Sequence, residues 1–315
     1  MPEGPEVRIV TIAIQKGLPA IFEGTEVLEN VPGKLHRYSR KKPKNWDIIS
    51  HNRFEMIRAR TKGKLISLDI KTLHDNKEWT LLVTLGMEAD FRWNSAGHKH
   101  TRFAFIKEQG DLSFVDLRCF GSLRICTPDE AREIENTKGW DLLNAPMPKD
   151  LWQQLQHKKR IRNKPVKPFL LTQDIVSGIG NIYASEALYL SRIHPATLIK
   201  DIPQQKWEVL NTHCHKVMYD ALRANGTSVI SFTADGHKGA GQDLLRVYMR
   251  KQCPKDHPIS KIKQGRGSNE RTSWFCQECQ PQYPHQDKDL DVKTFFEIIT
   301  KNPKWFFTYL DIAKA

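Results

Sequence analysis

Pro2-Glu3-Gly4-Pro5-Glu6-Val7 stands at the start of the chain, and the first expected helix, residues 5–17, grows out of it. If Met1 is removed, Pro2 carries a free secondary amine, and such an amine attacks an electrophilic sugar carbon to form a Schiff base. An α-amino group titrates near about 7.7–8.0, well below a lysine, so much of it is unprotonated at neutral pH. Glu3 stands beside this amine and can move protons. A plainer interpretation stays open, because proline and carboxylates are also the residues that begin helices.

Residues 24–125 have the pattern of short strands. Apolar and polar residues alternate in brief runs separated by turn residues, as in 65–70, 79–83, 102–106 and 112–115. Short strands at regular spacing predict a β-sandwich or a barrel. Thr127-Pro128-Asp129-Glu130 then predicts a helix start, because threonine caps a helix, proline suits its first position and Glu130 completes a capping box.

Helical periodicity dominates the second half of the chain. A proline-bearing linker at 145–150 precedes a helical stretch at 151–225, a glycine-marked loop lies within 227–243, and a cysteine-bearing module follows. We therefore expect an α+β chain with five parts: a β-sandwich domain at 1–126, a helix and linker at 127–150, a helical domain at 151–247, a cysteine-bearing module at 248–282, and an extension of unknown role at 283–315.

The composition favours a polyanionic partner. The chain has 49 basic and 36 acidic residues and a formal charge of +13. A protein this basic usually meets nucleic acid, although a solvated charged surface is the alternative. No window of eighteen apolar residues occurs, so we expect no membrane span. We expect an intracellular, reducing compartment, in which the six cysteines are free thiols or metal ligands.

Four residues have the spacing of a zinc site. Cys253 and His257 are separated by three residues, eighteen residues follow, and Cys276 and Cys279 are separated by two. Two close pairs joined by the length of a β-hairpin can converge tetrahedrally on Zn²⁺. Because all four positions are filled by protein, we expect a structural ion that holds a segment too small for its own core.

Three further patterns fit phosphate binding, each with a plain alternative. Lys261, Lys263, Arg266 and Arg271 lie between the zinc pairs and are either a groove-binding hairpin tip or solvated charge. Six of the ten residues 158–167 are basic, which is either a phosphate track or a surface run. Gly178 and Gly180 precede a helix whose N-terminus can bind phosphate, or they form a tight turn. Lys64 begins a strand, where it faces a phosphate or sits in a plain turn.

These segments occur in one order that resembles a known family. They are PEGPEV at 2–7, GKL at 63–65, LGM at 85–87, DLRCFG at 116–121, the 173–188 segment and RTSWFC at 271–276. From residue 2 to about 282 the chain resembles the formamidopyrimidine-DNA glycosylase/endonuclease VIII enzymes of base-excision repair. The Cys-His-Cys-Cys ligand set is most similar to the second endonuclease VIII-like branch of vertebrates, and a viral or protist relative fits equally well.

The resemblance implies a fold, an activity and a set of site residues. The fold is an N-terminal β-sandwich flanked by helices, a helix-two-turns-helix domain and a zinc β-hairpin. The activity is a bifunctional DNA glycosylase and AP lyase that flips out an oxidised base, pyrimidines first, and uses Pro2 as nucleophile. The residues that match the family's positions fall into four roles: Pro2, Glu3 and Lys64 in catalysis; Glu6 in support; Lys64, Lys167, Asn181 and Arg271 on the phosphates; and Met87, Arg118 and Phe120 in the gap left by the base.

Base preference, partner and location are less determined. The loop 235–241 is about as long as the loop that covers oxidised purines in formamidopyrimidine glycosylases, which leaves purines open as substrates. We expect a monomer on damaged DNA, duplex or single-stranded, and a nuclear location if eukaryotic, or the host or virion compartment if viral. Two rivals stay open: a non-catalytic binder of damaged or single-stranded DNA, and a basic zinc-ribbon protein of RNA or ribosome assembly. The aromatic residues of 295–309 predict a tail that packs on the body or binds a partner.

Overall fold

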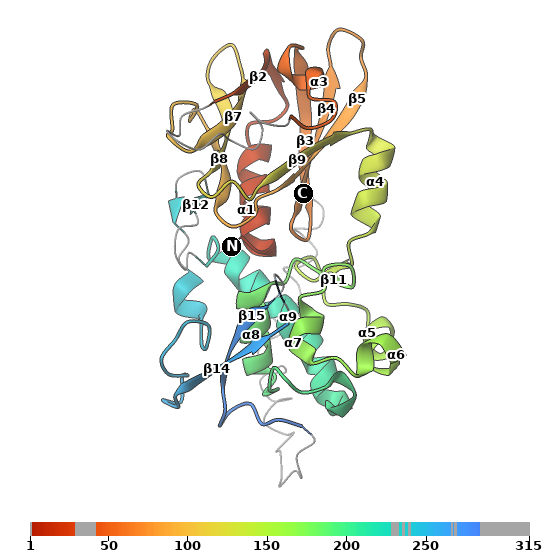
Figure 1. Cartoon of the computed structure of the whole chain (residues 1–315), viewed down its shortest axis with the longest axis vertical. Helices are drawn as coiled ribbons and strands as arrows, with labels where there is room; N and C mark the ends of the chain where they lie inside the picture. Colours follow the sequence, from red (N-terminus) through yellow and green to blue (C-terminus); the bar gives the residue numbers. More distant parts are fainter. Residues whose placement is uncertain are drawn as a thin grey trace, which may run out of the picture. The chain divides into compact units, whose positions relative to one another are not determined.

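The computed structural model describes residues 2–28, 42–227, 241–265, 267 and 270–283, together with the backbone of 233–234 and 237–238 (Figure 1). Residues 1–283 form one compact unit. The aromatic tail at 295–309 and most of the loop at 235–241 lie outside the described residues, so the predictions made for them stay predictions.

The N-terminal half contains the expected sandwich of two antiparallel sheets. One sheet has the order β1-β3-β4-β5-β9 and the other the order β2-β7-β8-β6. The first consists of β1 (Ala20–Phe22), β3 (Phe54–Lys62), β4 (Leu65–Thr72), β5 (Glu78–Thr84) and β9 (Ser122–Cys126). The second consists of β2 (Gly24–Val27), β7 (Thr101–Ile106), β8 (Asp111–Asp116) and β6 (Ala89–Trp93). Two separate sheets settle the choice between sandwich and barrel.

An aromatic cluster fills the space between the sheets. Phe22 and Phe54 of one sheet lie against Phe105 of the other, with ring centroids 5.8–5.9 Å apart. Phe91 and Phe114 extend the cluster along the second sheet and are buried. Such rings bury large apolar areas and interlock edge to face, so they account for the packing of the two sheets.

Three helices flank the sandwich. Helix α1 (Gly4–Gln15) packs on β3 and β6, and α3 (Asp47–Ser50) lies beside β2. Helix α4 (Pro128–Asn136) follows β9 and begins as predicted, because Glu130 N–H donates to Thr127 Oγ1 at 3.3 Å and Thr127 N–H donates to the Glu130 carboxylate at 3.0 Å.

The second half is helical, as expected from its periodicity. Its elements are α5 (Lys149–His157), α6 (Lys159–Arg162), α7 (Val166–Leu170), α8 (Asn181–Leu190), α9 (Gln204–Arg223) and the 3-10 turns η1 (Ile199–Asp201) and η2 (Gly241–Leu244). Short strands β10 (Trp140–Asp141) and β11 (Val176–Ser177) pair in parallel, and β12 (Thr233–Ala234) pairs with β13 (His237–Lys238).

Two stacked tryptophans form the centre of the helical core. The rings of Trp152 and Trp207 lie 4.4 Å apart, and each indole N–H donates to the other residue's carbonyl. This pair ties α5 to α9, and Phe169 of α7 packs against both rings.

A hairpin of β14 (Ile259–Gln264) and β15 (Arg271–Cys276) completes the unit. Gln264 and Gln280 donate to the carbonyls of Pro195 and Ile193, which follow α8. Gln264 and Gln280 therefore attach the hairpin to the segment that follows α8, and the Asn181 side chain at the start of α8 donates to Thr272 O of β15.

Candidate active site and metal centre

Three segments far apart in the sequence meet at their glycines. Gly4 N–H donates to Gly178 O at 2.8 Å, which joins the start of α1 to the turn before α8. Gly63 lies so close to Ser177 that a Cβ there would meet the serine Cβ at 2.7 Å. Its N–H donates to Asp141 Oδ2 at 2.9 Å. The backbones of the PEGPEV, GKL and SGIG segments are thus in direct contact, which only residues without side chains permit.

The Glu3 carboxylate lies at the N-terminus of α8. Ile182 N–H donates to Glu3 Oε1 at 2.9 Å, and Tyr183 N–H lies 3.4 Å from Oε2. An added Cβ at Gly180, the cap of this helix, would lie 2.3 Å from Glu3 Cδ. The prediction that these helix donors bind phosphate is therefore wrong in this structure, because a carboxylate from residue 3 occupies them.

Burial shifts the pKa values of Glu3 and Lys64, the two oppositely charged groups at the centre of the site. Glu3 and its neighbour Pro2 are both buried. Burial raises the pKa of Glu3, while Lys64 and the N–H groups of α8 oppose the rise. Burial likewise lowers the pKa of Lys64, against the attraction of Glu3 and Glu6. A carboxyl group that holds its proton more readily and an amine that loses it more readily are suited to proton transfer near neutral pH.

Glu6 is the hub of a second buried cluster. Glu3 N–H donates to Glu6 Oε2 at 3.0 Å, and Thr227 N–H donates to Oε1 at 3.0 Å. The Tyr183 hydroxyl donates to the same carboxylate, and its pKa is raised well above the ordinary value by burial and by the charge of Glu6. Glu6 therefore links the start of α1 to the residue that opens the 227–243 loop. Tyr183 and Thr227 had no local pattern that marked them in advance, since their partners lie more than 170 residues away in sequence.

Lys64, Asn181 and Arg271 lie near one another around the start of α8. Asn181 is the first residue of α8, and its side-chain amide donates to Thr272 O at 3.0 Å. Arg271, at the start of β15, is exposed, and its charge contributes to the lowered pKa of Lys64. The Asn181 Oδ1 atom is buried and has no hydrogen-bond partner in the described part of the chain.

Lys167 does not lie on the surface, and its predicted phosphate contact is wrong in this structure. The side chain is 1% exposed, and Nζ donates to Ser185 Oγ at 2.6 Å. Burial lowers the pKa of Lys167 to about 7, although the carboxylates of Glu3 and Glu186 favour its charged form. The helical period of α7 turns this one cation of the basic run into the core.

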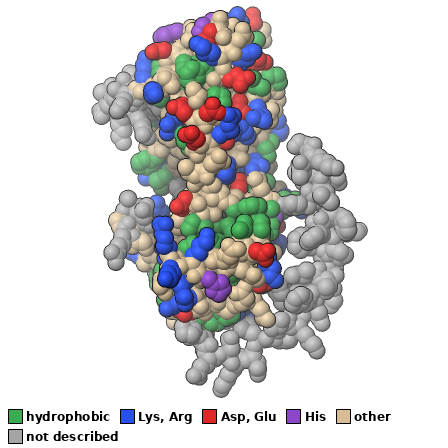
Figure 2. Space-filling model, turned by 90° about the vertical axis from the view of Figure 1, so that its right-hand side faces the viewer, with side chains coloured by type: hydrophobic (Ala, Val, Ile, Leu, Met, Phe, Trp, Pro, Cys, Tyr) green, Lys and Arg blue, Asp and Glu red, His purple; other side chains and the backbone are tan. Residues whose placement is uncertain are grey.

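The rest of that run stays exposed on and around α6. Its cations are Lys158, Lys159, Arg160, Arg162 and Lys164, and Ile161 anchors the segment in the core. Figure 2 looks at the side of the chain that carries α4, α5 and α6, and Lys and Arg side chains form a column on its lower half.

Met87, Arg118 and Phe120 lie on two loops that touch. Phe120 is 52% exposed and Met87 36% exposed, and the guanidinium of Arg118 stacks over the Phe120 ring at 5.1 Å. Gly86 joins the loops, because a Cβ there would lie 2.5 Å from the Phe120 carbonyl carbon. Neither apolar side chain belongs to the buried core of the sandwich.

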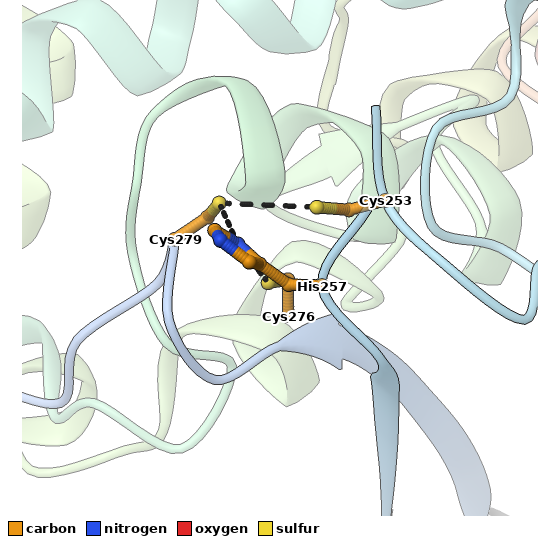
Figure 3. Close-up of side chains that lie close together, drawn as sticks. All are labelled: Cys253, His257, Cys276 and Cys279. Atoms are coloured by element: carbon orange, nitrogen blue, oxygen red, sulfur yellow. Dashed lines mark hydrogen bonds between the residues drawn. The ribbon is translucent and has the colours of Figure 1, made fainter. Parts of the chain in front are cut away.

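Cys253, His257, Cys276 and Cys279 converge at the base of the hairpin (Figure 3). Their ligand atoms lie within 4.8 Å of one another. Cys253 Sγ is 4.0 Å from Cys279 Sγ, and His257 Nδ1 is 3.4 and 3.7 Å from the sulfurs of Cys279 and Cys276. A tetrahedral ion with Zn–S bonds of about 2.3 Å requires sulfur–sulfur edges of about 3.8 Å, so the set has the size of a metal site.

Comparison with known proteins identifies the family of this fold and site. The chain matches the model of the formamidopyrimidine-DNA glycosylase N-terminal domain over residues 1–123 and that of the formamidopyrimidine-DNA glycosylase H2TH domain over 141–233. The formamidopyrimidine-DNA glycosylase of Pediococcus pentosaceus is 32% identical over 292 residues, which cover 89% of this chain and 99% of the relative. That of Pelotomaculum thermopropionicum is 30% identical with the same coverage.

Solved structures share the fold. MutM in complex with DNA containing carbocyclic 8-oxo-G matches with a TM-score of 0.74, 23% identity and coverage of 89% of this chain and all of that one. A Lactococcus lactis enzyme with abasic-site DNA matches with a TM-score of 0.73 and the same identity and coverage.

The fold and site define a DNA glycosylase of base-excision repair. The chain belongs to the formamidopyrimidine-DNA glycosylase family. Among the described residues, no helix combines the length and apolar character that crossing a bilayer requires.

Proposed function

We propose that this glycosylase is bifunctional: it removes oxidised bases from DNA, pyrimidines first, and then cuts the strand as an AP lyase. The Pro2 nitrogen, once Met1 is removed, forms a bond to C1′ of the damaged nucleotide, and the C1′–base bond breaks with its electron pair leaving on the base. Glu3 delivers a proton to the sugar oxygen as the ring opens to an iminium ion. Loss of the C2′ proton then expels the 3′ phosphate, and a δ-elimination expels the 5′ phosphate.

The observation that carries this proposal is the position of Glu3. Its carboxylate lies buried at the N-terminus of α8 and next to buried Pro2. It is also close enough to Lys64 for that positive charge to oppose the rise in its pKa. A binding module has no need of a proton-carrying carboxyl group at this junction. A catalytic amine at residue 2 needs one within reach of the sugar that it attacks.

Damaged DNA would be held by residues near the start of α8 and by the two loops that carry Met87 and Phe120. Lys64, Asn181 and Arg271 offer two cations and a side-chain amide to the phosphates around the lesion. Met87, Arg118 and Phe120 are exposed in the way that residues entering a base stack must be. The relatives named above carry formamidopyrimidine-DNA glycosylase names, so purine lesions remain a second substrate class.

We propose that Cys253, His257, Cys276 and Cys279 hold a structural Zn²⁺. Three thiolates and one imidazole fill all four tetrahedral positions, so the ion would be left without an open position for chemistry. The ion would supply folding energy to the hairpin that carries Arg271.

Three finer assignments are also proposals. The Cys-His-Cys-Cys set supports the second endonuclease VIII-like branch of vertebrates, and a viral or protist relative fits equally well. The location would be the nucleus if the source is eukaryotic, or the host or virion compartment if it is viral. The proposed division into parts at 1–126, 127–150, 151–247, 248–282 and 283–315 agrees with the end of β9 at Cys126, whereas its boundary at 150/151 falls inside α5 (Lys149–His157). A monomer suffices, because every residue assigned to the site comes from one chain.

Replacement of the nucleophile tests the proposal. Pro2→Gly, or a variant that retains Met1, should lose the cutting of abasic-site DNA while its affinity for an uncleavable abasic analogue stays within about twofold. Pro5→Gly, which changes the next proline of the same segment, is the matched control and should keep activity. If all three proteins cut DNA normally, the Pro2 mechanism is wrong; if wild type binds lesions without cutting, the non-catalytic binder replaces it.

A further inference from the structure

The loop 117–121 carries Arg118 and Phe120, and one buried side chain organises its backbone. Asp116, the last residue of β8, is 1% exposed. Its Oδ1 accepts the N–H groups of Arg118 at 3.1 Å and Cys119 at 2.9 Å, and its Oδ2 accepts the N–H of Gly121 at 2.7 Å. The carboxylate therefore fixes three of the five backbone amides of the loop.

Arg102 holds the same loop from the neighbouring strand. This residue is buried and lies at an irregularity in the pairing of β7 with β8, which turns its side chain toward the end of β8. Its Nε donates to Asp116 O at 2.6 Å, and its second nitrogen donates to Leu117 O at 3.3 Å. Asp116 accepts three amides of the loop while Arg102 binds the carbonyls of Asp116 and Leu117 at its start, so both kinds of backbone group are held by buried side chains.

These hydrogen bonds matter because the loop contains a residue with a strained backbone conformation. Cys119, between Arg118 and Phe120, has φ +58°, in the left-handed region that residues other than glycine rarely adopt. The side chains at the tip gain little from packing, since Leu117 and Phe120 are about half exposed. Without the Asp116 hydrogen bonds, the loop would populate other conformations, and Phe120 would enter a base stack from a smaller fraction of molecules.

We infer that Asp116 and Arg102 are positioning residues for duplex DNA: they preorganise Arg118 and Phe120 so that the loop can fill the base stack and hold the opposite strand. The inference rests on the proposed function. It adds a specific consequence, because a single strand has no opposite strand to hold. The contribution of Asp116 should therefore appear on a duplex and vanish on single-stranded DNA that carries the same lesion.

The test is single-turnover cutting of one abasic-site oligonucleotide, alone and paired, by Asp116→Asn. An asparagine of the same shape replaces one acceptor oxygen with a donor that faces backbone N–H groups. We expect the duplex rate to fall tenfold or more and the single-strand rate to stay within twofold. Asp111→Asn is the matched control, because Asp111 begins the same strand, is buried, and accepts the amides of Ser95 and Ala96 far from the site.

Two further variants keep the outcome decisive. Asp116→Asn added to a variant that already carries Arg118→Ala and Phe120→Ala should slow duplex cutting no further, since Asp116 acts through those two side chains. Arg102→Lys keeps the charge but cannot reach both carbonyls, and it should show the same duplex-selective loss if Asp116→Asn does not fold. Equal losses on both substrates, a loss matched by Asp111→Asn, or a further loss when Asp116→Asn is added to the Arg118→Ala, Phe120→Ala variant would each overturn the inference. If Phe120→Ala alone leaves duplex cutting unchanged, the proposed role of the loop fails instead; if wild type cuts neither substrate, the lyase proposal fails.

Discussion

Gly180→Ala should separate the position of the Glu3 carboxylate from the stability of the fold. The backbone of Gly180 is extended, with φ −136° and ψ −159°, so alanine fits its conformation. The new Cβ, however, would lie 2.3 Å from Glu3 Cδ and 2.5 and 2.7 Å from its oxygens, whereas ordinary contacts begin near 3.4 Å. The carboxylate must therefore retreat by about 1 Å, and its 2.9 Å hydrogen bond from Ile182 would be lost.

A displacement of about 1 Å at a reacting group costs on the order of 10²-fold in rate. This corresponds to about 2.7 kcal/mol in the activation barrier. We expect that loss in single-turnover cutting of abasic-site duplex, with only a modest fall in melting temperature, because the lower entropy of the unfolded chain partly offsets the lost hydrogen bond.

Gly97→Ala is the control for this experiment, since nothing lies within 4 Å of a Cβ built at Gly97. It should cut at the wild-type rate. If Gly180→Ala is folded and also cuts at the wild-type rate, then the placement of Glu3 against α8 does not govern the chemistry, and the reasoning from this contact is refuted.

Two other predictions concern stability. Lys167 has a pKa of about 7 in the folded chain and an ordinary value near 10.5, so the unfolded chain holds a proton that the folded chain releases. The free energy of unfolding should therefore rise with pH between about 7 and 10, by up to about 1.4 kcal/mol per unit. In urea titrations across this range, the free energy of unfolding of wild type should rise relative to that of Lys167→Met as the pH rises. If the two free energies change with pH in the same way, the burial of a neutral lysine is contradicted. Chelation of zinc, or Cys276→Ser, should unfold the hairpin and weaken DNA binding while near-UV signals of the sandwich persist; unchanged affinity in metal-free protein would refute the structural role of the ion.

Local features were predictable from the sequence because their partners are near in the chain. The capping box of Thr127 and Glu130 spans three residues, and the zinc pairs have a spacing that two turns and a hairpin impose. The series of short strands likewise predicted a sandwich or barrel, although β8 is buried on both faces and does not alternate.

Long-range contacts overturned two predictions made from local patterns. The glycine turn before α8 has the sequence of a phosphate site, but Glu3, nearly 180 residues away, fills it. Lys167 belongs to a run of exposed cations, yet its place on α7 directs it to Ser185 in the core. Glu3 lies 179 residues from Ile182 and Ser185 lies 18 residues from Lys167, so the packing of separate elements, and not the local pattern, decided both contacts.

Borohydride trapping on DNA that carries an oxidised pyrimidine tests the central claim most directly. Reduction of the iminium ion would freeze the bond between protein and sugar, and mass analysis of the linked peptide would locate it. We predict a cross-link at the nitrogen of Pro2 in chains that have lost Met1. A cross-link at a lysine, or none at all in Met1-free protein that still binds the lesion, would contradict the account.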